Sequence, residues 1–264
     1  MVAGEDDAMQ RDHYYDSARA LGDLAAAHAV GVETGRRTLA RLDSRSLSTR
    51  NAPVILSAEL ARGFFGHLVG AVSGGSLYRK ASFLLDAQGR QIFPGWMQIY
   101  EQPHLLRGPG SSNFDDEGVA TLPNSLVSGG VLERYVLGSY SARKLGLSST
   151  GNAGGVHNLT VTPNAGALAE LLGDMGTGLY VTELLGQGVN LITGDYSRGA
   201  AGFWVEQGKI IHPVHEITIA GNLKQMFTDI IAVGNEIDHR GNVRTGPIHL
   251  REMTIAGESG QEED

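Results

Sequence analysis

The chain has 264 residues, of which 41% are hydrophobic and 19% are charged, a composition typical of a folded globular protein and unlike that of a disordered one. Its 21 lysines and arginines stand against 29 acidic residues, and the resulting net charge of -8 argues against direct nucleic-acid binding. Cysteine is absent, which excludes disulfides, a thiol nucleophile and thiolate metal ligands.

The first half of the chain predicts two helices and a buried strand between them. Residues 18–42 have helical periodicity, and the apolar run at 53–56 suits a buried strand. Ser57 can cap a second helix at 58–72. After Gly74 the chain becomes rich in loops, until residues 131–140 predict another strand.

The second half is dominated by short runs typical of β-strands. They lie at residues 159–162, 178–185, 189–193, 202–206, 209–212, 217–220 and 248–255. One helix interrupts them, because apolar residues from Leu223 to Ile231 follow helical spacing and Asn222 can cap it. The predicted fold class is α+β, with mostly antiparallel β-sheets and a few packed helices.

Glycine is the most unusual residue count, at 37 of 264, about twice its average share. Two glycine clusters, at 186–188 and 194–199, flank the apolar run at 189–193. The bare pattern favours tight turns between strands. The alternative is a backbone that lines a cleft and accepts an extended peptide by strand addition.

No short motif for catalysis is complete. A zinc hydrolase of the His-Glu-x-x-His type needs two imidazoles one helical turn apart, but His215-Glu216 is followed by Ile219 at the second ligand position and lies in a predicted strand. Ser141 and Lys144 match the Ser-x-x-Lys element of penicillin-recognising enzymes, a pattern with only two fixed positions that arises easily by chance. Composition and periodicity therefore predict an α+β protein without assigning it a reaction.

Longer ordered strings of residues resemble the TldD/PmbA family. They are GHLVGA at 66–71 with LYRKASF at 77–83, FDDEGVA at 114–120, SYSARKLG at 139–146, TGNAGG at 150–155, GQGVNL at 186–191, GDYSRGAAGFWV at 194–205 and TIAGNL at 218–223. The resemblance runs from about Arg11 to Gly257. Within the family, the chain is similar to a PmbA-type (TldE-type) subunit. The resemblance divides the chain into a divergent N-terminal extension at 1–10, a TldD/PmbA-type C-terminal domain at 11–257 and an acidic tail at 258–264.

The resemblance implies a part in zinc-dependent peptide hydrolysis, and family members are also described as modulators of DNA gyrase. In this family the TldD-type subunit holds zinc with a His-Glu-x-x-x-His helix and a later cysteine, which the PmbA-type subunit lacks. Placing the family's Arg-Lys pair on Arg79-Lys80 sets Gly66, His67 and Ala71 at the positions of first histidine, glutamate and second histidine. The resemblance thus implies no catalytic residue and no metal ligand in this chain, with zinc expected in the partner subunit.

His67 keeps two interpretations, a buried or interface histidine and a residual metal or acid/base role. The resemblance also implies that the second glycine-rich region shapes a cleft or contacts a substrate or partner. The residues expected to do so are Gly186, Gly188, Asp195, Tyr196, Ser197 and Arg198.

The leading expectation is a non-catalytic subunit that assists a TldD-type zinc-bearing partner in cleaving peptides or unfolded polypeptides. Two alternatives stay open: a standalone protein that binds a polypeptide or a gyrase-pathway component without hydrolysis, and a self-sufficient peptidase. A homodimer of this chain is a further alternative. Family members carry an additional α/β domain before this region, so the resemblance implies either a fragment or a late start of the reading frame.

The expected location is the cytoplasm, with no membrane segment. The first ten residues do not resemble a secretory signal, and no apolar run approaches the roughly 20 residues of a membrane-spanning helix.

Overall fold

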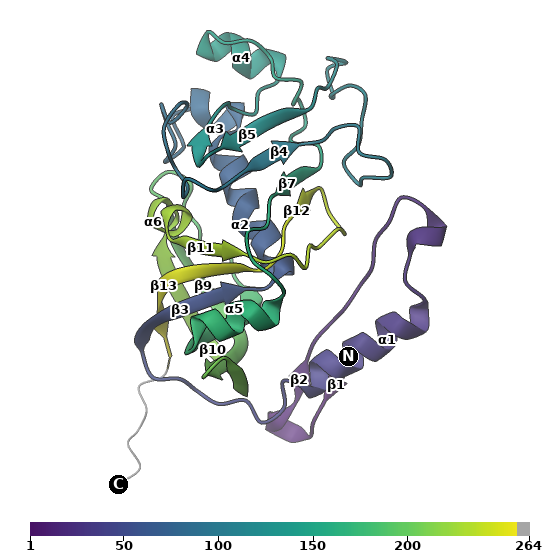
Figure 1. The fold of residues 1–264 in the computed structure, drawn as a ribbon, viewed down its shortest axis with the longest axis vertical. Coiled ribbons are helices and arrows are strands. Elements are labelled where there is room, and N and C mark those ends of the chain that lie inside the picture. Colours follow the sequence, from purple (N-terminus) through teal and green to yellow (C-terminus); the bar gives the residue numbers. More distant parts are fainter. Residues whose placement is uncertain (258–264) are drawn as a thin grey trace.

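A computed structural model describes residues 1–257, so the predicted acidic tail at 258–264 lies outside the described residues. Figure 1 labels most of the helices and strands. In chain order they are β1 (Val2–Ala3), β2 (Gln10–Arg11), α1 (Ala27–Leu39), β3 (Arg50–Leu56), α2 (Ala58–Ala71), α3 (Gly74–Tyr78), β4 (Ile99–Glu101), β5 (Asn124–Ser128), β6 (Val131–Leu132), α4 (Ser139–Leu145), β7 (Leu159–Val161), α5 (Leu168–Met175), β8 (Gly178–Leu185), β9 (Asp195–Glu206), β10 (Lys209–Asn222), α6 (Leu223–Thr228), β11 (Ile230–Val233), β12 (Val243–Arg244) and β13 (Ile248–Ala256). Within this described part, no helix has the length and apolar character needed to cross a membrane.

The fold is mixed α+β with two main sheets. The larger sheet has the order β10-β9-β8-β3-β13-β11, and β10 also pairs with β13 through Thr218–Ala220, so five of its strands form a closed ring. The smaller sheet has the order β12-β7-β4-β5-β6. Each sheet contains one parallel pair, β3 with β8 and β12 with β7. The sheets are therefore mixed rather than purely antiparallel, because long connections containing helices join the paired strands.

Strand β3 shows how the sequence sets the sheet register. Pro53 lies inside this strand and has no backbone N–H to donate. On the neighbouring strand β13 the register shifts between Leu250 and Met253, opposite the interval from Val54 to Ala52. Pairing with β8 begins only at Val54. The irregularity of β13 thus falls where proline would break a regular ladder.

Helix α2 contacts both sheets, through β3 and β8 on one side and β12 on the other. Its residues Phe64 and Phe65 are buried and belong to one continuous core. Phe64 meets Phe227 of α6 edge to face with ring centroids 5.2 Å apart, and Phe227 in turn lies 4.8 Å from Phe93. One aromatic core therefore joins the two sheets around α2.

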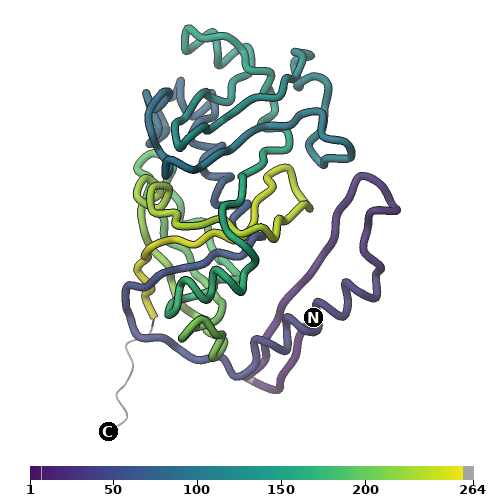
Figure 2. Tube along the Cα trace, in the orientation of Figure 1, coloured from purple at the N-terminus to yellow at the C-terminus, as the bar shows by residue number. Residues whose placement is uncertain are grey.

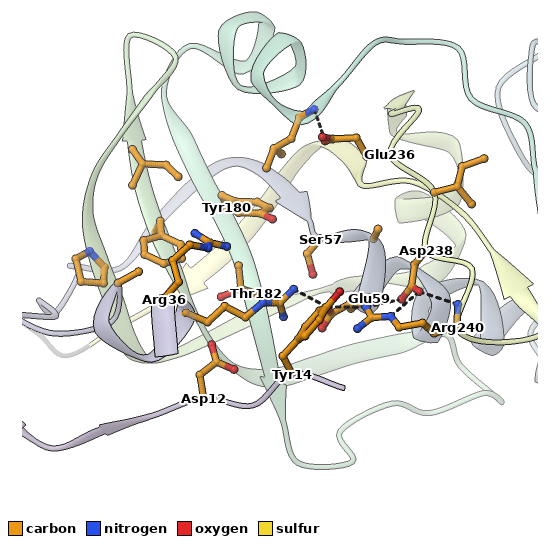
Figure 3. A pocket seen from close by; sticks show the side chains of 18 of the residues that line it. Asp12, Tyr14, Arg36, Ser57, Glu59, Tyr180, Thr182, Glu236, Asp238 and Arg240 are labelled. Atoms are coloured by element: carbon orange, nitrogen blue, oxygen red, sulfur yellow. Dashed lines mark hydrogen bonds and ion pairs between the residues drawn. The ribbon is translucent and has the colours of Figure 1, made fainter. Parts of the chain in front are cut away.

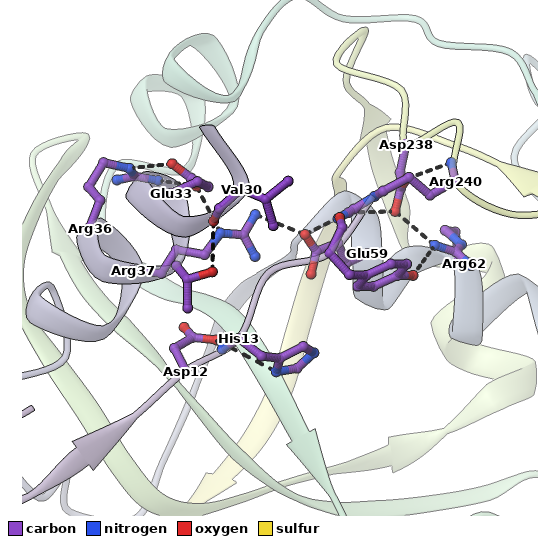
Figure 4. A network of polar contacts seen from close by, with 12 residues as sticks. Asp12, His13, Val30, Glu33, Arg36, Arg37, Glu59, Arg62, Asp238 and Arg240 are labelled. Carbon is purple, nitrogen blue, oxygen red and sulfur yellow. Dashed lines mark hydrogen bonds and ion pairs between the residues drawn. The ribbon is translucent and has the colours of Figure 1, made fainter. Parts of the chain in front are cut away.

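The N-terminal residues form an arm beside this body, seen in purple in Figures 1 and 2. The arm contains the short pair β1 and β2 and the helix α1. Figure 4 shows part of the polar network that holds α1 to the body, including Arg37 and Glu59. Arg37 of α1 bonds Glu59 of α2 at 2.8 Å, and Arg41 bonds both Asp12 and Glu183 of β8. The arm is attached largely by arginine–carboxylate pairs.

Several predicted elements are confirmed, although some begin or end at other residues than predicted. The strands at 53–56 and 178–185 are present, and Asn222 caps α6 by accepting a hydrogen bond from the Lys224 amide at 3.1 Å. However, α6 ends at Thr228, and the next apolar residues belong to β11. The first predicted helix, 18–42, begins only at Ala27, because the Asp16 carboxylate accepts the Ala25 amide and folds the preceding segment into a loop.

Two strand predictions are wrong over most of their length. At 131–140 only Val131–Leu132 is a strand, and α4 already begins at Ser139. At 189–193 the chain turns instead, because the Asn190 side chain accepts the amide of Ile192 at 2.9 Å. In both stretches a polar side chain or a helix start overrides the β-type pattern.

A buried polar cluster fixes the glycine-rich segment at 151–155 against the smaller sheet. Glu101 of β4 is 2% exposed and accepts hydrogen bonds from the Arg134 guanidinium, the Asn152 amide and the His157 backbone N–H. Arg134 also donates to the Asn152 side chain at 2.8 Å. These buried charges are stable only because each faces its partner.

We predict that Glu101→Gln lowers the free energy of unfolding by about 3–5 kcal/mol, since it leaves the buried Arg134 charge without its counter-ion. The exposed Glu133 is the matched control, and Glu133→Gln should change stability by less than about 0.5 kcal/mol. Urea titration of both variants measures the difference. Equal effects would contradict a structural role for the pair.

Candidate functional site

The three positions aligned with the family's zinc motif lie on α2 but in different surroundings. Gly66 is exposed, and a methyl group added there would meet no atom within 4 Å. His67 is half-buried. Ala71 is 0% exposed and belongs to the main core. The helix therefore presents one of the two histidine positions to solvent and the other to the core.

His67 lies against strand β9. Its ring meets the ring of Tyr196 edge to face, with centroids 6.0 Å apart. Burial, and then the positive charge of Arg198, lower the pKa of His67, so the imidazole is neutral at pH 7. Tyr196 is 2% exposed, and burial raises its pKa to about 12. His67 thus packs as a neutral aromatic group beside a protonated tyrosine.

The loop between β8 and β9 folds back on the start of β9. The Ser197 amide donates to the Gly188 carbonyl at 2.7 Å, and the Asn190 amide donates to the Asp195 carbonyl at 2.9 Å. A methyl group on Gly188 would stand 1.8 Å from the Ser197 carbonyl oxygen, so this close approach requires glycine. The Asp195 carboxylate accepts from the Thr193 hydroxyl and the Asn222 amide, and these bonds lower its pKa.

The structure thus brings together the residues predicted to contact a substrate or partner. Gly186 and Gly188 lie in this loop, and Asp195, Tyr196, Ser197 and Arg198 open β9 beside it. Locally the glycines serve as turn and close-approach residues. The backbone there is paired within the chain, so strand addition at this point would have to displace the bond between Ser197 and Gly188. A contact role for their exposed surface stays a prediction.

The side chains present do not fit the zinc site of the family. Across residues 1–257, no group of three or more His, Asp or Glu side chains is arranged to hold a metal ion. At the aligned positions, the single imidazole of His67 stands where the family has a carboxylate. We therefore derive no metal-dependent step for this chain.

A separate cavity of about 1000 Å³ lies at the N-terminal end of α2 (Figure 3). Its walls come from six parts of the chain: the segment before α1, α1 itself, the first turn of α2, the start of α5, strands β8 to β10, and the loop around Asp238. Sequence reasoning missed this cavity, because no local pattern links residues so far apart. The one hint was Ser57, predicted to cap α2.

Ion pairs close one side of the cavity. Glu59 of α2 accepts from Arg37 at 2.8 Å and from Arg240 at 2.6 Å, and Asp238 is paired with Arg240 and Arg62. Burial would raise the pKa of Asp238, but hydrogen bonds from Arg240 and Arg62 outweigh it and hold this pKa at about 2. The network in Figure 4 is therefore charged throughout the neutral pH range.

The sequence profile described as the PmbA/TldA metallopeptidase C-terminal domain matches residues 49–257. A relative from Escherichia coli O157:H7, named Metalloprotease PmbA, is 55% identical over 258 residues. This chain belongs to the TldD/PmbA family. The expected family is thus confirmed, on a match that covers 98% of this chain and 57% of the relative.

Two further family members extend the comparison. A protein of Haemophilus influenzae, named Metalloprotease PmbA homolog, is 50% identical over 258 residues, covering 97% of this chain and 57% of that protein. A crystal structure from Thermotoga maritima, described as a modulator of a DNA gyrase, superposes with a TM-score of 0.89 at 28% identity and covers 97% of this chain and 60% of that one. The chain spans little more than half the length of the curated relatives that it matches.

We predict that Gly66→Ala raises the free energy of unfolding by about 0.5–1 kcal/mol, because the added methyl group meets open space within a helix. Ala71→His should lower it by about 2–4 kcal/mol, because a bulky polar ring would enter the core. Chemical denaturation measures both. A stable Ala71→His variant would contradict the burial argument.

We also predict that Gly188→Ala lowers the free energy of unfolding by about 1–3 kcal/mol, since the methyl group would collide with the Ser197 carbonyl oxygen. Gly66→Ala serves as its control, because that position tolerates the same change. If Gly188→Ala proves neutral, the close approach in this loop is not a constraint on the fold.

Proposed function

We propose that this chain is a non-catalytic PmbA-type (TldE-type) subunit of a two-component zinc peptidase that processes or degrades peptides and unfolded polypeptides. Its partner is a TldD-type subunit, which carries the zinc. One observation carries the proposal: the α2 positions aligned with the family's ligands hold Gly66, His67 and the core residue Ala71. Such a helix cannot supply the second imidazole without disturbing the core.

In this proposal the chain acts by shape and by backbone contacts. The metal and the glutamate that assists hydrolysis are contributed by the partner. The face formed by His67 and the loop 186–198 contacts the partner or the extended substrate. Arg198 is the basic group on this face, half-buried beside His67 and donating to the Leu185 carbonyl.

The test measures hydrolysis of an unstructured polypeptide in zinc buffer. Three samples are compared: this chain alone, the TldD-type subunit of the same cell alone, and the mixture. We expect cleavage only in the mixture, or a strong increase there over the partner alone. Cleavage by this chain alone would overturn the proposal, because it requires a metal site that the donor set does not provide.

A second outcome separates the subunit from a standalone binding protein. If the mixture is inactive while a full-length pair cleaves the same substrate, the subunit proposal fails for this chain. Binding of the polypeptide without cleavage would then favour the alternative, in which this chain is a standalone binding protein.

We predict that Arg198→Ala lowers the activity of the mixture about tenfold when this chain is limiting, since it removes the charge of the proposed contact face. Arg251→Ala is the matched control, because Arg251 is 69% exposed on β13 and lies outside that face. Adding excess variant chain should restore activity if Arg198 contacts the partner. Equal activity of the two variants would exclude a contact role for Arg198.

A further inference from the structure

Hydrogen-bond donors without partners converge at one end of the cavity. The hydroxyl groups of Ser57 and Thr182 are buried, and neither has a hydrogen-bond partner. The side chain of Ser57 is more than nine-tenths buried and, with Thr182, lines the cavity (Figure 3). The backbone N–H groups of Ala58 and Glu59 open the 14-residue helix α2 there, and no acceptor within residues 1–257 takes them.

This arrangement is unusual for a folded protein. A serine at a helix N-cap normally accepts a hydrogen bond from the first turn, but the Ser57 side chain makes no such bond. Buried polar groups are nearly always paired. Ser57 immediately precedes α2 and Thr182 lies in β8, so the unsatisfied groups come from two parts of the chain and mark a shared space.

The charges around this space leave the donors free for a ligand. The nearby carboxylates are already engaged: Glu59 by Arg37 and Arg240, Asp238 by Arg62 and Arg240, Asp12 by Arg41, Asp16 by the Ser17 and Ala25 amides, and Glu236 by the Leu168 amide. The start of α2 adds the positive end of the helix dipole. Free hydroxyls and amides at a helix start fit an anionic acceptor with two oxygens, and so they fit a carboxylate.

One wall of the cavity carries several apolar side chains. Tyr180 of β8 stacks on Phe203 of β9, with centroids 6.3 Å apart and planes inclined by 23°. Ile210 and Pro213 of β10 continue this wall. Burial raises the pKa of Tyr180 to about 12, so its hydroxyl stays protonated and adds a donor and no negative charge.

We propose that this cavity binds a carboxylate carried on an apolar group. Ser57, Thr182 and the first amides of α2 hold the carboxylate, and Tyr180 and Phe203 contact the apolar group. Two sources carry this chemistry, the C-terminal residue of a peptide and a small hydrophobic acid. The first residue of α2, Ala58, lies nine residues from His67, roughly 13 Å along the helix. The proposal for this cavity does not depend on the proposed role of the chain as a subunit.

The first experiment compares three probes by isothermal titration calorimetry and protein-observed NMR. They are N-acetylphenylalanine, its C-terminal amide, and the free acid of acetyl-Ala-Ala-Phe. We expect the acids to bind at least tenfold more tightly than the amide, because only the carboxylate accepts charge-assisted bonds. Tighter binding of the tripeptide indicates a peptide C-terminus, and tighter binding of N-acetylphenylalanine indicates a small acid.

The second experiment uses Ser57→Ala and Thr182→Val. Their hydroxyls have no partner in the free protein, so neither substitution should lower the melting temperature. Each should weaken binding of the acids about tenfold or more, whereas Ser125→Ala, an exposed serine on β5, should not. The proposal is overturned if no probe binds at millimolar concentration, if acid and amide bind equally, or if both variants bind like the control.

Discussion

Helix α2 is the element on which the rest of the structure depends. Phe64, Phe65, Leu68 and Ala71 are buried on it, and this burial joins the two sheets into one core. Removing a single buried phenylalanine from such a core costs about 3–5 kcal/mol. The same burial fixes which helix positions can face solvent. It therefore decides what chemistry α2 can support.

That constraint links the fold to the proposed function. In the zinc-binding helix that the family resemblance implies, two histidines must reach one ion and a glutamate must lie beside it. Here the last of the three positions, Ala71, is part of the core, and His67 packs against Tyr196. Helix α2 therefore serves mainly to pack the core. In the proposed function its exposed positions contact another chain. At the other end of α2, Glu59 anchors the N-terminal arm through Arg37 and also pairs with Arg240, and Ser57, whose hydroxyl has no partner, lines the cavity.

Much of this could be predicted from the sequence, because strong local patterns carried it. The apolar run of β3, the start of α2 after Ser57 and the cap at Asn222 are all local signals. The failures lie where distant residues compete with local preference. Arg134 is drawn to Glu101 of β4, and the predicted strand at 131–140 ends early. Asp16 binds the Ala25 amide and shortens the predicted first helix.

The same distinction between local patterns and distant contacts applies to the candidate site. The glycine-rich strings identified the family and the loop beside β9, but the sequence could not show that Gly188 is needed for contact with Ser197. It also could not show that the Ser57 side chain leaves its helix uncapped. A serine before a helix is an ordinary cap until the surrounding structure is known.

The measurement that tests the central claim most directly is zinc binding to this chain by equilibrium dialysis. The protein is first treated with a chelator, and bound zinc is then counted per chain by mass spectrometry, with the TldD-type subunit as positive control. We predict no stoichiometric zinc on this chain and one zinc on the control. One zinc per chain, lost in His67→Ala, would contradict the proposal that α2 contributes no metal site.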